Sequence, residues 1–257
     1  MSLQRSWALF RHETRITFAD PGVLVFLIFM PVLFTMVMKP LFQLSLNAEG
    51  FSNASGAEQA VPGMAAMFAG FSAAFAGFTF FREHGWATWD RLRASSATTL
   101  DIMVGKLAPP FVITTVQIFT LFGVGVILLD LNISGSLVGL AVVVVAFAMS
   151  MLSFGLAITA LSRTSLQLNT YANLGAIVFA VIGGAMVPTS VLPSWVQTLG
   201  HFTPTFWAMD GLLGVVLDGD GVIDVVRPTL ILLLFTAGFA AIAALKFRVE
   251  ETKIFYG

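Results

Sequence analysis

The three histidines are the residues best suited to acid–base or metal chemistry, but their surroundings favour neither. His12, His84 and His201 lie far apart in the sequence, and none belongs to an HExxH pattern. The sequence also lacks a GxSxG elbow. Ser194 lies seven residues before His201, but two side chains on one short helix do not make a catalytic dyad. We therefore expect no catalytic residues and no enzyme activity of the chain's own.

The sequence also contains no complete motif for binding phosphate or metal ions. Gly105-Lys106 is followed by leucine, and leucine occupies position 100, where a P-loop needs glycine. Asp218-Gly219-Asp220-Gly221 resembles the start of a calcium loop but lacks the later glutamate. The absence of cysteine excludes disulfides and cysteine metal sites. We expect no cofactor in this chain, and any ATP it depends on must be hydrolysed by another chain.

Residues suited to binding a protein concentrate in the stretch 81–93. It is the most charged run between two apolar segments, and it holds two of the five tryptophans. The spacing predicts a single helix over 83–93, because Glu83, Trp86, Trp89 and Leu92 or Arg93 recur at steps of three or four. We expect this face to be pushed by a cytoplasmic partner. The alternative is an amphipathic helix lying on the membrane.

The elements around this stretch are predicted to be membrane-spanning helices. Hydrophobic residues make up 57% of the chain and charged residues 11%, and the mean hydropathy is +0.90, which few soluble domains reach. Continuous apolar runs of about 18–20 residues are long enough to cross a bilayer as helices. We predict an all-α polytopic membrane protein with spans near 22–42, 60–81, 103–129, 137–161, 169–187 and 228–247.

The positive charges orient these six helices. Eleven of the 13 lysine and arginine residues fall on one side of the predicted bundle, together with both termini, which places that side in the cytoplasm. The uncharged run 164–209 is long enough for two crossings, but a seventh helix would export Lys246, Arg248 and Lys253. We therefore expect 188–227 to be extracytoplasmic, as short re-entrant helices lying on or dipping into the outer leaflet.

The first 20 residues predict an amphipathic helix. Leu3, Trp7, Phe10 and Phe18 can share one face, and a helix with arginine and tryptophan suits the headgroup boundary. The alternative is a helix packed on its own bundle. The segment lacks a signal-peptide cleavage pattern, so we expect it to be retained.

The predicted spans contain almost no ionisable residue away from their ends, although ion-coupled carriers keep such groups near the midplane. Methionines and phenylalanines instead recur on the second span, where soft, aromatic walls suit varied apolar substrates. These pathway candidates, with three polar residues, are Met64, Met67, Phe68, Phe71, Phe75, Phe78, Gln117, Asn169 and Asn173. Helix packing or lipid contact is the alternative for each.

Two motifs resemble those of the ABC-2-type permeases, the membrane subunits of one class of ATP-binding-cassette exporter. The first runs from Glu83 through Trp89-Asp90-Arg91-Leu92-Arg93-Ala94-Ser95 to Gly105-Lys106, and the second is Val187–Trp195 with Thr203-Pro204 and Trp207–Asp210. Within this family, the chain most resembles the drug-export (daunorubicin-resistance-like) branch. Ser96 stands where many members have proline.

The resemblance implies one transmembrane domain over 1–257, with an interfacial helix (1–20), a coupling loop (82–101) and an outer gate segment (188–227). It also implies that a coupling helix docks on a separate ATPase subunit through Trp86, Trp89 and Leu92, with Glu83, Arg91 and Arg93 at the charged edge. The implied outer gate carries Pro188, Pro193, Trp195, Pro204 and Trp207.

The function implied by the resemblance is the permease subunit of a bacterial exporter in the cell (inner) membrane, moving hydrophobic or amphipathic substrates such as drugs or lipids. Two ATPase copies would bind ATP and Mg, and a second permease copy would complete a homodimer, in preference to a heterodimer. Membrane lipid is a further partner; nucleic acid is not. A scaffold or sensor that recruits a partner through 83–93 is the alternative, and a secondary carrier is the third possibility.

Overall fold

The computed structural model describes residues 3–19, 21–48, 50–51, 54–246 and 253. Every regular element in these residues is helical, which confirms the predicted fold class. The elements are α1 (Leu3–Ala19), α2 (Pro21–Ala48), α3 (Ala57–Gly85), α4 (Trp89–Ala94), α5 (Thr99–Leu128), α6 (Leu137–Leu161), α7 (Ser165–Ile182), the 3-10 turn η1 (Thr189–Val191), α8 (Ser194–Gly200), α9 (Pro204–Leu213), the π-helical turn η2 (Gly214–Asp218) and α10 (Val226–Lys246).

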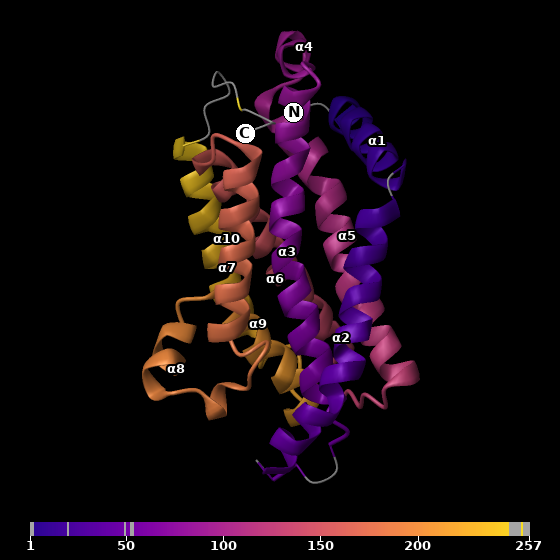
Figure 1. The fold of residues 1–257 in the computed structure, drawn as a ribbon, viewed down its shortest axis with the longest axis vertical. Coiled ribbons are helices and arrows are strands. Elements are labelled where there is room, and N and C mark those ends of the chain that lie inside the picture. The colour runs from indigo at the N-terminus through magenta and orange to yellow at the C-terminus, as the bar shows by residue number, and fades with distance from the viewer. Residues whose placement is uncertain (1–2, 20, 49, 52–53, 247–252, 254–257) are drawn as a thin grey trace.

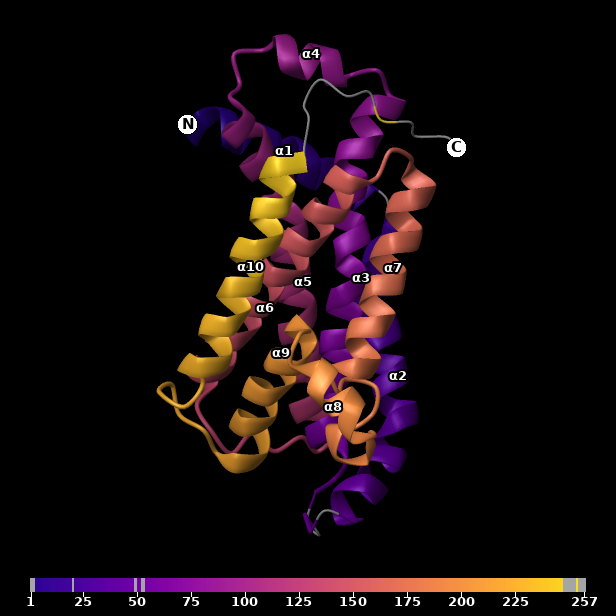
Figure 2. The same cartoon turned by 90° about the vertical axis from the view of Figure 1, so that its left-hand side faces the viewer.

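Six of the described helices are long and apolar enough to span a bilayer: α2, α3, α5, α6, α7 and α10. They form an elongated bundle with α3 and α6 at its centre (Figures 1 and 2). The most apolar window of α3 is 78% buried and that of α6 is 61% buried, against 17% for α10. The outer helices therefore expose most of their apolar surface, as expected where lipid replaces water.

The central helices approach each other closely because of Gly155 on α6. A Cβ at Gly155 would lie 2.4 Å from the backbone oxygen of Ala73 on α3. Further along α3, a Cβ at Gly77 would lie 2.4 Å from the hydroxyl oxygen of Thr159 on α6. Small residues at such contacts let helices pack in a bilayer, where apolar burial alone does not drive association.

The two ends of the bundle carry different elements. The helix α1, the short helix α4 and the end of α10 lie at one end, while α8 and α9 lie at the other (Figure 2). The helix α5 begins with a capping box, in which Thr98 and Asp101 each bond the other's backbone N–H. The helix α9 begins with a Thr203 cap and Pro204 in its first turn, a position that suits proline.

The predicted spans agree with the observed helices to within four residues, except at the ends of the first and the fifth. The helix α2 continues to Ala48 rather than ending near residue 42. The helix α7 ends at Ile182 rather than near residue 187. Gly183 closes it, and Gly184 adopts a left-handed backbone with φ 84°, which ends a right-handed helix.

Candidate functional site

A group of four charged side chains, three of them buried and one half-buried, joins three helices at the end of the bundle that carries α4. Lys106, near the start of α5, is 0% exposed. Its Nζ lies 2.5 Å from Glu13 Oε1 of α1 and 2.8 Å from Glu83 Oε1 of α3. Arg82 of α3 forms an ion pair with the other carboxylate oxygen of Glu13. We call these four residues the ion cluster; two carboxylates balance two cations in it.

Lys106 uses its full hydrogen-bonding capacity in the ion cluster. An ammonium has three N–H donors; two bind the carboxylates, and the third binds the carbonyl oxygen of Thr79 at 3.1 Å. Glu13 is 1% exposed and Glu83 7% exposed. A buried charge is costly unless it is paired, so each member depends on the others. The ion cluster thereby fixes α1, α3 and α5 relative to one another.

A second set of contacts joins α1 to the segment between α3 and α5. Ser6 Oγ donates a hydrogen bond of 3.2 Å to Asp101 Oδ1 in the capping box of α5. The Arg5 guanidinium donates to the carbonyl oxygen of Ser96. Both bonds come from the first two turns of α1, so the linking segment 86–98 is anchored on α1 as well as on its flanking helices.

The single helix predicted over 83–93 is wrong. The helix α3 continues to Gly85, and α4 begins only at Trp89. Between them Ala87 adopts a left-handed backbone with φ 53°, which an α-helix of L-residues does not tolerate. The predicted common face therefore does not form, and Glu83 points into the ion cluster rather than to the edge of a docking surface.

The two tryptophans of this segment differ in environment. Trp86 is 53% exposed, and its ring centroid lies 5.1 Å from the Arg82 guanidinium. Trp89 is only 5% exposed; its ring lies 4.8 Å from that of His84, and it packs against Phe80. Trp86 is thus available to a partner, whereas Trp89 holds α4 against the bundle.

The remaining residues of the predicted docking face lie on α4. Arg91 is exposed and Leu92 is half-buried. Arg93 belongs to α4, but its side chain lies outside the described part of the structure. Trp86, Asp90 and Arg91 are therefore the exposed large or charged side chains in the described part of 83–93.

Lys253, from the C-terminal segment, packs at the same end of the bundle. Its Nζ donates to the carbonyl oxygens of Thr159 at 2.7 Å and Ser162 at 2.8 Å, at the end of α6. Cations are favourable at helix C-termini because carbonyl groups there have no intrahelical partner. The ammonium also lies 5.2 Å from the ring of Phe81, so Lys253 contacts the end of α3 as well.

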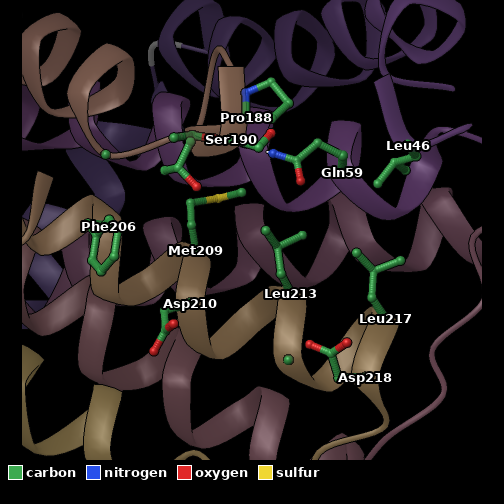
Figure 3. A pocket seen from close by; sticks show the side chains of 14 residues that line it. Leu46, Gln59, Pro188, Ser190, Phe206, Met209, Asp210, Leu213, Leu217 and Asp218 are labelled. Carbon is green, nitrogen blue, oxygen red and sulfur yellow. Dashed lines mark hydrogen bonds between the residues drawn. The ribbon is translucent and has the colours of Figure 1, made fainter. Parts of the chain in front are cut away.

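A pocket of about 210 Å³ lies at the opposite end, between α9–η2 and the start of α3 (Figure 3). Met209 and Leu213 point from α9 toward Gln59 of α3 (Figure 3). Asp210 and Asp218 also line it, on the α9–η2 side (Figure 3). We call this cavity the outer pocket; its walls combine apolar side chains with oxygen atoms.

Sequence similarity identifies the family of the chain. The model of the ABC-2 type transporter family matches residues 4–217, which run from α1 to η2. The chain belongs to this family. It is 30% identical over 161 residues to the linearmycin resistance permease protein LnrN of Bacillus subtilis (strain 168), which is 61% of this chain and 40% of LnrN. It is 29% identical over 175 residues to the probable multidrug ABC transporter permease YbhR of Escherichia coli (strain K12), which is 65% of this chain and 46% of YbhR.

The chain spans less than half the length of these relatives. The family match includes the ion cluster, the linking segment 86–98 and every residue that lines the outer pocket except Asp218, whereas α10 lies beyond it. The ion cluster therefore falls wholly within the ABC-2 part of the chain, and the outer pocket falls within it except for Asp218.

The predicted gate residues of this ABC-2 chain lie in the elements between α7 and α10. Pro188 precedes η1 and lines the outer pocket, Pro193 precedes α8, and Pro204 begins α9. Trp195 is 65% exposed. Trp207 is 7% exposed, and its indole N–H donates to the carbonyl oxygen of His201 at 2.9 Å. The structure brings Pro188 and the start of α9 to one pocket but leaves Trp195 at the surface.

The pathway candidates on α3 separate into two groups. Met64 and Phe68 are each 2% exposed, and the Phe68 ring packs 5.7 Å from that of Phe34 on α2, so both belong to the core. The others are half-buried and follow each other at steps of four and three along one face: Met67, Phe71, Phe75 and Phe78. Only this second group borders open surface.

The three polar pathway candidates also differ from one another. The side-chain amide of Asn173 donates to Asn169 Oδ1 at 2.6 Å, on the accessible side of α7. Gln117 is 1% exposed, and neither of its amide atoms has a hydrogen-bond partner in the described part of the chain. Gln117 is thus a buried polar group whose lost hydrogen bonds to water are not replaced by hydrogen bonds to the described residues.

Sequence reasoning missed Glu13 and Gln59 and underrated Lys106. A signal for the ion cluster was present, because Lys106 falls inside the predicted span 103–129, and an intramembrane cation requires a carboxylate partner. Ser6 and Glu13 lie seven residues apart on α1, so a polar stripe faces the bundle. Nothing comparable marked Gln59, whose place in the pocket depends on where α9 packs.

Proposed function

We propose that this chain is the membrane-spanning permease subunit of an ATP-driven exporter, energised by a separate ABC ATPase subunit. The observation that carries the proposal is the Lys106 ion cluster, which ties both helices flanking the linking segment 86–98 to α1. Family membership supports the ATPase partner, and relatives named for linearmycin resistance and multidrug transport support export.

In this proposal the ATPase docks on the exposed surface formed by Trp86, Asp90 and Arg91. Buried Trp89 holds α4 against the bundle, so that a movement of α4 is transmitted to the bundle rather than taken up by a flexible loop. The ion cluster then passes the movement to α1, α3 and α5 together, because its charges cannot separate without being left unpaired. ATP and Mg would be bound by the ATPase, not by this chain.

The same proposal orients the chain in a bacterial cell membrane. The end with α4 and α1 faces the cytoplasm, as the positive-inside bias requires, and α8 and α9 face outward as the gate segment. Trp7 and Phe18, which are 64% and 63% exposed, would lie at the inner headgroup boundary. A second copy of the chain and a second ATPase would complete the exporter, with hydrophobic or amphipathic molecules as its substrates.

Reconstitution tests this function. The chain and a separate ABC ATPase subunit from the same organism are placed in lipid vesicles, and ATP-dependent movement of a hydrophobic dye is measured. Export requires transport that stops with a catalytically dead ATPase. Transport that continues without ATP and collapses with the ion gradient would instead identify a secondary carrier. Tight binding of the ATPase with no transport of any tested compound would favour the scaffold.

A further inference from the structure

The helix α1 has one face on the bundle and an open groove on another. It lies across the end of the bundle rather than along it (Figure 2). Ser6 and Glu13 are buried and bond to side chains of α5. A groove of about 560 Å³ runs along a different side of the helix, and every described residue that lines it belongs to α1 itself. The groove is therefore a surface of α1 that the bundle leaves open.

The positive charges in this groove are not paired within the described part of the chain. Arg11 and Arg15 line the groove and are exposed, and neither forms a hydrogen bond or ion pair with a described residue. Arg82, at the same end of the bundle, instead pairs with Glu13. Glu13 is the one acidic residue of α1 and is only 1% exposed. Because two guanidinium groups one helical turn apart can donate to the same anion, the groove favours a negatively charged ligand.

Aromatic side chains border the two arginines and point to a second property of the ligand. Trp7 is 64% exposed and Phe18 is 63% exposed. The ring of Phe10 stacks on that of Trp7, with 5.1 Å between the ring centroids, and all three residues line the groove. Covering such apolar surface is favourable, and tryptophan is typical of membrane boundaries. The groove thus combines a place for an anion with a place for hydrocarbon, the two parts of an anionic phospholipid.

We propose that this groove of α1 binds an anionic phospholipid of the inner leaflet, whose phosphate accepts hydrogen bonds from Arg11 and Arg15. The adjoining part of the lipid's hydrocarbon contacts Phe10 and Phe18. The cytoplasmic leaflet supplies such lipids and attracts basic segments beside it. The inference deepens the proposed function, on which it rests for the orientation of α1, by naming the lipid that this subunit selects.

Quenching of Trp7 fluorescence tests the groove. The full chain, without ATPase or ATP, is purified in a neutral detergent and titrated with brominated phosphatidylglycerol or brominated phosphatidylcholine, because bromine quenches a tryptophan that contacts the lipid. The contribution of Trp7 is the part of the quenching that Trp7→Phe removes. Phosphatidylglycerol should reach half of this quenching at a mole fraction at least about fivefold lower than phosphatidylcholine does, since two arginines attract the anionic headgroup.

Two double variants with the same loss of charge separate the groove from the overall charge of this end. Arg11→Gln combined with Arg15→Gln should abolish the preference for phosphatidylglycerol. Both arginines are exposed, so the unfolding curve in phosphatidylcholine should stay close to that of the wild type. Arg163→Gln combined with Lys246→Gln, at exposed residues beside the ends of α6 and α10, should keep the preference.

Four results would overturn the inference. Equal quenching by the two lipids in the wild type would remove the selectivity, and equal losses in the two double variants would assign it to the overall charge. Reversal of the quenching by water-soluble glycerol 3-phosphate would assign the arginines to a free phosphate. Protection of Trp7 from both lipids in a purified dimer would assign this side of α1 to the second copy of the chain.

The same measurements distinguish this inference from the proposed function. Selective binding of phosphatidylglycerol by a chain that transports nothing with its ATPase would refute the exporter alone. ATP-driven transport by a chain that shows no preference between the two lipids would refute this inference alone.

Discussion

Lys106 Nζ lies 2.8 Å from Glu83 Oε1, so one ion pair joins the end of α3 directly to the start of α5. These are the two helices that the linking segment 86–98 connects. A force applied to the segment therefore reaches both helices at a point where they are already bound together, and Glu13 brings in α1 at the same atom.

Replacement of Lys106 by methionine should destabilise the folded chain by about 3–5 kcal/mol, because Glu13 and Glu83 remain buried and lose their shared cation. Unfolding in detergent, followed by circular dichroism, measures the change. Lys39→Met is the matched control at the other end. Lys39 pairs with Asp130, whose side chain is 87% exposed, so that loss should be about 1 kcal/mol or less. Equal losses would show that the ion cluster contributes no more than a surface pair.

Removing both charges of the Lys106–Glu83 pair separates the contribution of the ion pair from that of side-chain packing. Glu83→Gln in the Lys106→Gln background should cost less than the sum of the two single variants, because no buried charge of that pair is then left alone. Additive losses would contradict the coupling. The double variant also tests the role of the charges. If it binds the ATPase and the complex hydrolyses ATP without transport, the charges themselves are needed to transmit the movement.

The tryptophans provide a test of docking. Trp86→Ala should greatly weaken co-purification with the ATPase while the unfolding curve stays close to that of the wild type, because Trp86 is 53% exposed and anchors of this kind dominate interfaces. Trp89→Ala should instead cost about 3–5 kcal/mol of stability, as for other large-to-small changes in a packed core. Trp195→Ala, which changes an exposed tryptophan at the opposite end, should leave ATPase binding intact. Binding that survives Trp86→Ala would move the docking surface elsewhere.

Those two tryptophans show where sequence reasoning succeeds and fails. Hydropathy located all six long helices, since each had to be apolar over its own length, a property of contiguous residues. The spacing of Trp86 and Trp89 indicated one face only if the helix was continuous, and Ala87 breaks it. The Lys106–Glu13 pair joins residues 93 positions apart. Such a contact depends on how α1 packs against α5, and the spacing of residue types within one stretch of sequence does not predict that packing.

Gln117 should be replaceable with a gain in stability. Its amide atoms are buried without hydrogen bonds in the described part of the chain, so Gln117→Met should stabilise by about 1–3 kcal/mol. Gln167→Met is the control, because Gln167 Oε1 accepts from the backbone N–H of Arg163 at 3.0 Å and its loss should bring no gain. Transport that falls while stability rises would identify Gln117 as a substrate contact; a loss of stability would show that its amide is satisfied in the membrane.

Helix packing makes a prediction at Gly155. Alanine there would place its Cβ 2.4 Å from the backbone oxygen of Ala73, and backbone cannot move aside cheaply. Gly155→Ala should therefore cost about 1–3 kcal/mol. Gly123→Ala, on α5, meets nothing within 4 Å and should be neutral or stabilise by up to about 1 kcal/mol, since alanine is the better helix former. A neutral Gly155→Ala variant would mean that α3 and α6 are further apart than described.

Asp210, which lines the outer pocket, has a raised pKa. Although Asp210 is exposed overall, partial burial raises the pKa of its carboxyl; Arg227 and His201 oppose the rise and Asp220 adds to it. Below the raised pKa the carboxyl is neutral.

The same shift predicts how stability changes with pH. A carboxyl whose folded-state pKa is raised contributes stability that is fully present below its unfolded-state pKa and is lost as pH rises through the folded-state pKa. Asp210→Asn removes this dependence, so the variant should gain stability over the wild type near neutral pH, and the gain should vanish in acid. Thermal unfolding of both proteins across this pH range measures the difference. Asp224→Asn should give no comparable change, and a difference for Asp210→Asn that stays constant with pH would place its effect in packing rather than in titration.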